Sequence, residues 1–199
     1  MTLILDYGVG NLQSVMNALL FLGEDSDVAM DPASLRQADR LVLPGVGAFK
    51  HARRRLQSFD AALREYVEGG RPLLGLCLGM QLLFSRSSED GESEGLGIFK
   101  GDVHPLPTED VWGRVRIPHI GWTPLEGVRG PLFEGVKEGD CVYFAHSYAV
   151  LECDDCVAGA THGATFCAAV SRDNVHATQF HPEKSGAVGL RILENFLKC

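Results

Sequence analysis

The stretch Pro72-Leu73-Leu74-Gly75-Leu76-Cys77-Leu78-Gly79-Met80-Gln81 decides how the rest of the chain is organised. Its apolar first half predicts a buried parallel strand, and residues 78–84 predict the start of a helix. Cys77 therefore stands at a strand-to-helix corner, the place where the nucleophiles of hydrolase-like folds are found. Gly75 and Gly79 lie two residues to either side, and a Cβ at either position would crowd the corner.

Two features of such a corner favour a reactive thiol at Cys77. The N-terminus of a helix attracts negative charge and therefore stabilises a thiolate. The free N–H groups of the first helical turn can also hold an oxyanion that develops during a reaction. A buried structural cysteine is the alternative interpretation, because free cysteines are among the most buried residues. The motif by itself leaves both interpretations open.

A second motif, Gln179-Phe180-His181-Pro182-Glu183-Lys184-Ser185, lies far downstream. It follows the strand-like run 175–178, so we expect it at the same edge of the sheet as Cys77. A catalytic cysteine needs a base beside the thiol and a third group that orients the base. His181 and Glu183 supply both, since side chains two residues apart on an extended chain point the same way. Alone, this segment would be an ordinary loop; with the cysteine corner it predicts a Cys77–His181–Glu183 triad.

These two motifs together resemble those of the class I glutamine amidotransferases. Other segments are similar to one branch of that family, the glutaminase subunits of imidazole glycerol phosphate synthases in histidine biosynthesis. The segments occur in the family's order along nearly the whole chain: residues 6–12 (DYGVGNL), 44–47 (PGVG), 118–122 (PHIGW) and 144–148 (FAHSY). The resemblance implies an α/β fold in which helices flank a doubly wound, mostly parallel sheet, with an additional antiparallel strand region.

The resemblance also implies the chemistry. Cys77 would attack the side-chain carboxamide of glutamine, His181 would transfer protons and Glu183 would orient the imidazole, so that glutamate and ammonia are released. The implied oxyanion hole consists of the backbone amides of Leu78, Gly45, Val46 and Gly47. The residues implied to hold the main-chain end of glutamine are Gln81, His146, Ser147 and Tyr148. Those implied at the partner interface are Asn11, Pro118 and Trp122.

Viewed without the resemblance, the glycine-rich segment 44–47 has two interpretations. Glycines allow a turn to present bare backbone amides to a substrate. A plain turn between a strand and a helix is equally consistent with these residues. The role of the segment as part of an oxyanion hole therefore comes from the resemblance alone.

A partner is expected because ammonia is mostly protonated at neutral pH and would be lost to water. The resemblance implies that the partner is the cyclase subunit, a barrel enzyme, in a heterodimer. The 199 residues leave no room for such a barrel, so we expect it on a separate chain. The implied chemistry requires neither a metal nor an organic cofactor.

Three other classes of function remain open. The first is an amidotransferase subunit of another pathway, such as anthranilate, aminodeoxychorismate or pyridoxal phosphate synthase. The segment 118–122 argues against this class. The second is a cysteine peptidase or γ-glutamyl hydrolase that acts without a partner. The third is a regulatory module on the same fold, which would be expected to have lost at least one of the three triad residues.

Length and charge limit these possibilities further. The 199 residues suit one well-buried α/β domain, so we expect residues 1–199 to form a single glutamine amidotransferase domain. The net charge of −8 argues against a nucleic-acid surface. Strand-like residues 2–6 open the chain and no apolar run reaches membrane-spanning length. We therefore expect a cytoplasmic protein without a signal peptide.

Six cysteines raise the question of a metal or disulfide site. Cys153 and Cys156 form a C-x-x-C pair, but no second pair accompanies it at the spacing of a zinc site. Because the pair joins two strand-like runs, we expect an acidic hairpin with free thiols. Cys141 and Cys167 are expected in the core, and Cys199 is expected to be exposed.

The hydrophobic pattern predicts the remaining elements. Helices are expected at 12–22, at 48–68 with a break near Ser58, and at 185–199. Strands of the parallel sheet are expected at 3–6, 27–30, 40–43, 72–77 and 175–178. Antiparallel strands are expected at 102–104, 115–117, 141–144, 157–161 and 166–170, and a loop at 85–97.

Overall fold

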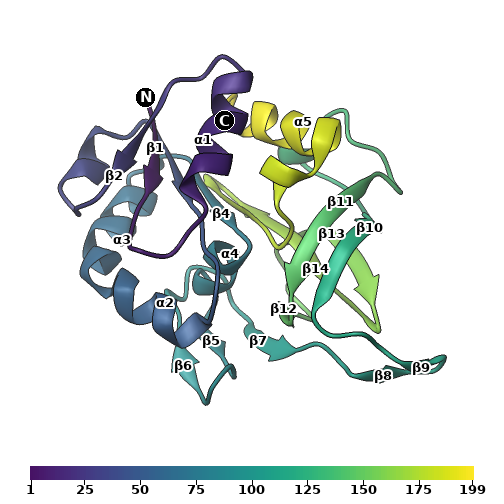
Figure 1. Cartoon of the computed structure of the whole chain (residues 1–199). Helices are drawn as coiled ribbons and strands as arrows, with labels where there is room; N and C mark the ends of the chain where they lie inside the picture. Colours follow the sequence, from purple (N-terminus) through teal and green to yellow (C-terminus); the bar gives the residue numbers. More distant parts are fainter.

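The computed structural model describes all 199 residues, and its central element is a seven-stranded sheet (Figure 1). The strand order is β13-β14-β15-β4-β3-β1-β2. The parallel strands are β1 (Thr2–Leu5), β2 (Ser26–Ala29), β3 (Arg40–Leu43), β4 (Leu73–Leu76) and β15 (Val175–Thr178). The antiparallel strands β13 (Cys156–His162) and β14 (Ala164–Arg172) extend one edge. The predicted doubly wound, mostly parallel sheet is confirmed.

Helices cover both faces of this sheet. They are α1 (Leu12–Phe21), α2 (Phe49–Leu56), α3 (Asp60–Glu68), α4 (Leu78–Leu82) and α5 (Gly186–Phe196). Side chains of a strand alternate between the two faces: Leu41 and Leu43 of β3 pack in the core beneath α2 and α3, whereas Val42 packs in the core beneath α1 and α5. Figure 1 shows α1 and α5 together and α2 with α3 on the other side.

The predicted break in the second helix is confirmed, because a short 3₁₀ turn, Gln57–Phe59, separates α2 from α3. No helix in the chain combines the length and the apolar character that a membrane crossing requires.

Smaller sheets lie beside the central one. β10 (His119–Pro124) pairs with β11 (Cys141–His146) in an antiparallel ribbon. A four-stranded sheet has the order β12-β7-β5-β6, with β5 (Arg86–Ser87), β6 (Ser93–Glu94), β7 (Asp102–Pro105) and β12 (Tyr148–Val150). The strands β8 (Glu109–Asp110) and β9 (Gly113–Arg114) form a hairpin that extends away from the body (Figure 1).

Several expectations for this part of the chain were wrong. Residues 85–97 are not only a loop, because β5 and β6 pair there and β5 joins β7. Residues 115–117 are not a strand; the chain there links β9 to β10. The strands β10 and β12 were not expected at all. The strands β10 and β12 are defined by partners far along the chain. The strands β5 and β6 have two residues each, and such short segments carry little pattern of their own.

Two expectations about cysteines also need correction. Cys153 and Cys156 do not form a hairpin; the Cys156 N–H donates to the Cys153 carbonyl (3.2 Å) in a turn between β12 and β13, which belong to different sheets. Both thiols are free, as expected. Cys141 is exposed because it starts β11 on the outward face, whereas Cys167 is buried and Cys199 is exposed, as expected.

Candidate active site

Cys77 occupies a strained corner between β4 and α4. Its backbone angles are φ 53° and ψ −110°, a left-handed conformation that non-glycine residues rarely adopt. Its N–H donates to the carbonyl of Thr178 on β15 (2.7 Å), which ties the corner to the neighbouring strand. A Cβ on Gly79 would stand 1.9 Å from the carbonyl oxygen of Leu43, and one on Gly75 would stand 2.9 Å from Leu83 Cδ1. The expected need for glycine on both sides of Cys77 is confirmed.

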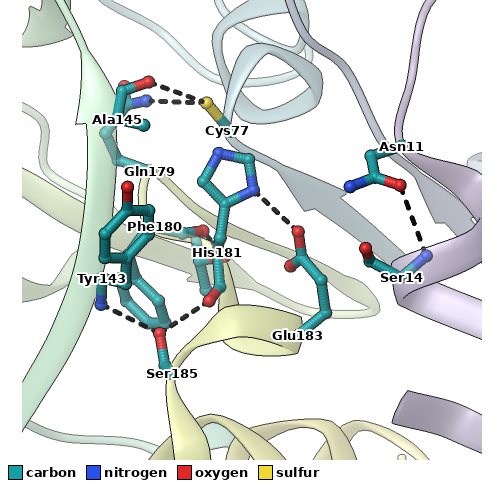
Figure 2. A network of polar contacts seen from close by, with 11 residues as sticks. Asn11, Ser14, Cys77, Tyr143, Ala145, Gln179, Phe180, His181, Glu183 and Ser185 are labelled. Carbon is teal, nitrogen blue, oxygen red and sulfur yellow. Dashed lines mark hydrogen bonds and ion pairs between the residues drawn. The ribbon is translucent and has the colours of Figure 1, made fainter. Parts of the chain in front are cut away.

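His181 and Glu183 follow β15, which lies parallel to β4 and next to it. His181 Nδ1 and Glu183 Oε1 are 2.8 Å apart, and the two side chains are 6% and 2% exposed. Because a carboxylate accepts, Nδ1 carries a proton and the other ring nitrogen is left for Cys77 (Figure 2). The contact was expected from an extended chain, but the backbone here is a 3₁₀ turn, Pro182–Lys184.

Backbone and hydroxyl contacts fix the position of His181. Its N–H donates to the carbonyl of Tyr143 on β11 (2.9 Å). The Ser185 hydroxyl donates to the carbonyl of His181 (2.6 Å) and accepts from the N–H of Tyr143 (2.9 Å). Figure 2 shows this arrangement below the imidazole. The base is therefore held by the strand, the turn and the antiparallel ribbon together.

The surroundings of His181 change its proton affinity. Burial acts to lower its pKa, but hydrogen bonds to Cys77 and Glu183 and their negative charges outweigh burial and raise the pKa to about 10. The second oxygen of Glu183 is buried without a hydrogen-bond partner. His181 is therefore the hydrogen-bond donor to the Glu183 carboxylate. The negative charge of this carboxylate favours the protonated imidazolium form of His181 beside the thiol.

Gln179 is a neighbour of Cys77 for which we had expected no role. Its side-chain Nε2 donates to Cys77 Sγ (3.8 Å), and its Oε1 accepts from Gln81 Nε2 (3.0 Å). The Cys77 thiol also approaches the carbonyl of Ala145 (3.9 Å). The position of Gln179, two residues before His181 in the same motif, was the signal that could have identified it.

A cavity of about 350 Å³ opens at Cys77. The expected site residues that line it are Val46, Gly47, Cys77, Leu78, Gln81, Pro118, His146, Ser147, Tyr148 and His181. The other lining residues are Glu89, Ile120, Ala145 and Lys184. The structure therefore brings expected residues from five separate segments of the sequence around one thiol.

Four expected site residues lie outside this cavity. Glu183 stands behind His181, and Gly45 packs where a Cβ would come within 2.7 Å of the Tyr7 hydroxyl. Asn11 caps α1 by accepting from the N–H of Ser14 (3.4 Å). The side chain of Trp122 is on β10, where the residue is 57% exposed.

Three of the four residues whose amides are expected to bind an oxyanion, Leu78, Val46 and Gly47, line the cavity. Leu78 is the first residue of α4, and its N–H has no backbone acceptor. Gly47 has φ +90°, a conformation that glycine adopts readily and other residues do not. A Cβ there would meet no atom within 4 Å, so only the backbone conformation requires glycine at this position.

His146 lines a second part of the cavity and His119 stands behind it; together they form what we call the histidine wall. His146 Nδ1 is 2.9 Å from the carbonyl of Tyr148, and its Nε2 is 3.0 Å from Nδ1 of His119. Both ring nitrogens of His146 are thus bonded within the protein. Burial lowers the pKa of His146 to about 3, and burial with the nearby His162 lowers the pKa of His119 to about 4.

The arrangement can support nucleophilic catalysis by a thiol. A cysteine at a helix N-terminus, a paired imidazole and free backbone amides meet at one small cavity. No cluster of three or more His, Cys, Asp or Glu side chains is arranged to hold a metal ion.

Residues 3–199 match the family described as glutamine amidotransferase class-I. The imidazole glycerol phosphate synthase subunit HisH of Syntrophotalea carbinolica is 50% identical over 203 residues, which cover 98% of each chain. The subunit of the same name from Aquifex aeolicus is 47% identical over 201 residues, which cover 98% of this chain and 95% of that one.

Solved structures share the fold. A structure described as a glutamine amidotransferase has a TM-score of 0.75 at 21% identity, covering 98% of this chain and 97% of the other. PurLQS from Thermotoga maritima has a TM-score of 0.75 at 18% identity, covering 99% and 97%.

Proposed function

The chain belongs to the class I glutamine amidotransferase family, and from this membership we propose that Cys77, His181 and Glu183 hydrolyse glutamine for an imidazole glycerol phosphate synthase. The chain is the glutaminase subunit of that enzyme, which functions in histidine biosynthesis. The observation that carries the assignment of residues is the meeting of the three side chains at the ends of β4 and β15, beside the cavity.

The reaction begins at the carboxamide carbon of glutamine. The Cys77 thiolate attacks this carbon while His181 carries the thiol proton. His181 then gives that proton to the leaving nitrogen, which departs as ammonia, and a thioester remains. A water molecule, deprotonated by His181, attacks the thioester and releases glutamate. Glu183 keeps the imidazole in position through both steps.

Backbone amides stabilise the charge that develops on the carbonyl oxygen. The Leu78 N–H is free for this purpose, and Val46 and Gly47 of the Gly45-Val46-Gly47 segment border the same space. Gln81 donates both hydrogens of its amide to protein groups, so its oxygen is left to accept from the α-ammonium of glutamine. Ser147 and Tyr148 border the substrate's main-chain end.

Ammonia passes to a cyclase subunit in a heterodimer. Ile120 and Trp122 support docking at this side, because they are large apolar side chains, 64% and 57% exposed, on the strand that borders the cavity. Pro118 lies at the cavity, and Asn11 lines a small neighbouring pocket together with His181 and Glu183. The cyclase makes imidazole glycerol phosphate and an aminoimidazole carboxamide ribotide (AICAR).

Residues 1–199 act as one domain in the cytoplasm.

The partner also switches the reaction on. A free glutaminase would release ammonia to water, so the isolated chain rests in a less competent state. Gly47 allows a peptide unit of the segment 45–47 to rotate at low steric cost, which turns an N–H toward or away from the oxyanion. Loss of one oxyanion donor typically costs on the order of a hundredfold to a thousandfold in rate.

The function is tested with the purified chain, the cyclase subunit and the cyclase substrate. With glutamine as the only nitrogen source, we expect imidazole glycerol phosphate and AICAR to form, and we expect none with Cys77→Ala. With Cys77→Ala and added ammonium salt, product should return, because the cyclase is intact. If glutamine supports no product with the cyclase but supports product with an anthranilate or aminodeoxychorismate synthase partner, the assignment to this pathway is wrong.

A further inference from the structure

A continuous chain of hydrogen bonds leads from β10 to the Cys77 thiol. On β10, Thr123 Oγ1 is 2.8 Å from His119 Nε2, and His119 Nδ1 is 3.0 Å from His146 Nε2. His119 and His146 are direct partners in the β10–β11 register. The bonds that continue the chain are His146 Nδ1 to the Tyr148 carbonyl (2.9 Å), Gln81 Nε2 to the same carbonyl (2.9 Å), Gln81 Nε2 to Gln179 Oε1 (3.0 Å) and Gln179 Nε2 to Cys77 Sγ (3.8 Å).

The direction of every bond in this chain follows from the Tyr148 carbonyl. A carbonyl oxygen can only accept, so His146 Nδ1 carries the hydrogen. A neutral imidazole has one donor and one acceptor, so His146 Nε2 accepts from His119 Nδ1. His119 Nε2 must then accept, and the Thr123 hydroxyl donates to it. The lowered pKa values of both histidines are consistent with neutral rings.

The same carbonyl fixes the amides on the other side. Gln81 uses its NH₂ group for Tyr148 and Gln179, so its oxygen is directed to neither of them. Gln179 accepts through Oε1, which leaves its NH₂ group for the sulfur of Cys77. If the Tyr148 carbonyl shifts, the Gln81 amide can turn, and the group offered to the substrate changes from an acceptor to a donor.

We propose that His119 is a positioning residue: with Thr123, it stabilises the His146 tautomer that donates to the Tyr148 carbonyl, and so holds this carbonyl and the Gln81 amide in the orientation that binds substrate. His119 reaches no cavity atom itself, because His146 stands between them. The inference rests on the proposed glutamine hydrolysis.

Packing alone would not require a histidine at this position. The His119 ring stacks on His162 (centroids 4.1 Å apart) and on Phe144 (4.9 Å), contacts that another aromatic ring could make. The hydroxyl of Thr123 likewise contributes little volume. A packing role and a positioning role for His119 therefore differ in one requirement. Only the positioning role needs the hydrogen that Thr123 donates.

The test compares Thr123→Val with Thr123→Ser in the complex with the cyclase. Valine keeps the shape but loses the hydroxyl, whereas serine keeps the hydroxyl. We expect Thr123→Val to raise KM for glutamine about fivefold, the effect of one neutral hydrogen bond, with kcat changed much less. Thr123→Ser should stay close to the wild type. In a His119→Phe background the two Thr123 variants should have the same KM.

The outcomes separate this inference from the proposed function. If the wild-type complex does not hydrolyse glutamine, the proposed function fails. If it does, and Thr123→Val and Thr123→Ser have equal KM, the positioning role fails. A second measurement does not depend on activity: NMR of the ¹⁵N-histidine-labelled wild-type chain should show His119 and His146 neutral at pH 7, each with its hydrogen on Nδ1. A charged ring or an Nε2–H tautomer at either residue would overturn the proposal.

Discussion

The cavity has two walls, and both are built on buried histidines that differ in charge. On the catalytic wall, His181 contacts Glu183 and Cys77, and its pKa is raised to about 10. On the histidine wall, His119 and His146 contact each other, a hydroxyl and a carbonyl, and their pKa values are lowered to about 4 and 3. All three residues are buried.

This difference shows that burial does not by itself decide the charge of a histidine. Burial acts to lower the pKa on both walls, and only an anionic partner reverses its effect. The catalytic wall can therefore hold a proton that moves during the reaction. The histidine wall holds its protons in fixed directions, which suits orientation rather than transfer.

The largest expected effect comes from removing the thiol of Cys77 on the catalytic wall. Cys77→Ala removes the proposed nucleophile, so glutamine hydrolysis should fall by on the order of a hundred-thousandfold or more. A glutamine-like alkylating analogue should label Cys77 and none of the other five cysteines. Mass spectrometry of the labelled protein checks this, and labelling at Cys153 or Cys156 would contradict it.

Removing the negative charge of the catalytic wall should have the next largest effect. Glu183→Gln keeps the size of the side chain but no longer stabilises the imidazolium, so kcat should fall on the order of a hundredfold or more. Steady-state hydrolysis of glutamine in the cyclase complex measures this. Thr123→Ser is the matched control on the histidine wall and should leave kcat unchanged. If Glu183→Gln hydrolysed glutamine at the wild-type rate, His181 would not depend on the Glu183 carboxylate.

The two walls should also respond to pH in opposite directions. An unfolded histidine has a pKa of about 6.5. The raised pKa of His181 gives stability that is complete below this value and is lost as pH rises toward about 10. The lowered pKa values of His119 and His146 give stability that is complete above 6.5 and is lost as pH falls toward about 4 and 3.

Denaturant unfolding at a series of pH values measures these slopes. Between pH 7 and 10, Glu183→Gln should lose less stability per pH unit than the wild type. Between pH 6.5 and 4, His119→Phe should lose less than the wild type. Each difference is bounded by about 1.4 kcal/mol per pH unit, the value for one proton. Parallel curves for the wild type and both variants would show that the walls do not differ in charge.

The smallest expected effect lies outside the cavity. Cys153 and Cys156 are free thiols in a turn, and we expect no metal there, so a chelator should change neither glutamine hydrolysis nor Tm. Stoichiometric zinc in the purified protein, with loss of stability on its removal, would contradict this.

The two walls were also unequally visible in the sequence. The catalytic wall could be predicted because Cys77 directly follows the parallel strand β4 and His181 comes three residues after the parallel strand β15, so that the pattern is local. Even there, the His181–Glu183 contact was expected from an extended chain and is made by a 3₁₀ turn. Gln179 was missed because its bond to Cys77 depends on the distance between two strands.

The histidine wall could not be predicted in the same way. His119 and His146 meet only because β10 and β11 pair in one register, and β10 was not expected as a strand. Cys141, at the other end of β11, was placed in the core for the same reason: which face of a strand is buried depends on its partners. Short antiparallel strands with distant partners carry too little pattern to settle this.

The most direct test of the account is the steady-state rate of glutamine hydrolysis in three states. These are the free chain, the complex with the cyclase, and the complex with the cyclase ligand bound. We predict that the rate rises by at least on the order of a hundredfold from the first state to the third, because in our proposal the partner completes the oxyanion hole at the segment 45–47. Equal rates in all three states would contradict the account and indicate a hydrolase that acts alone.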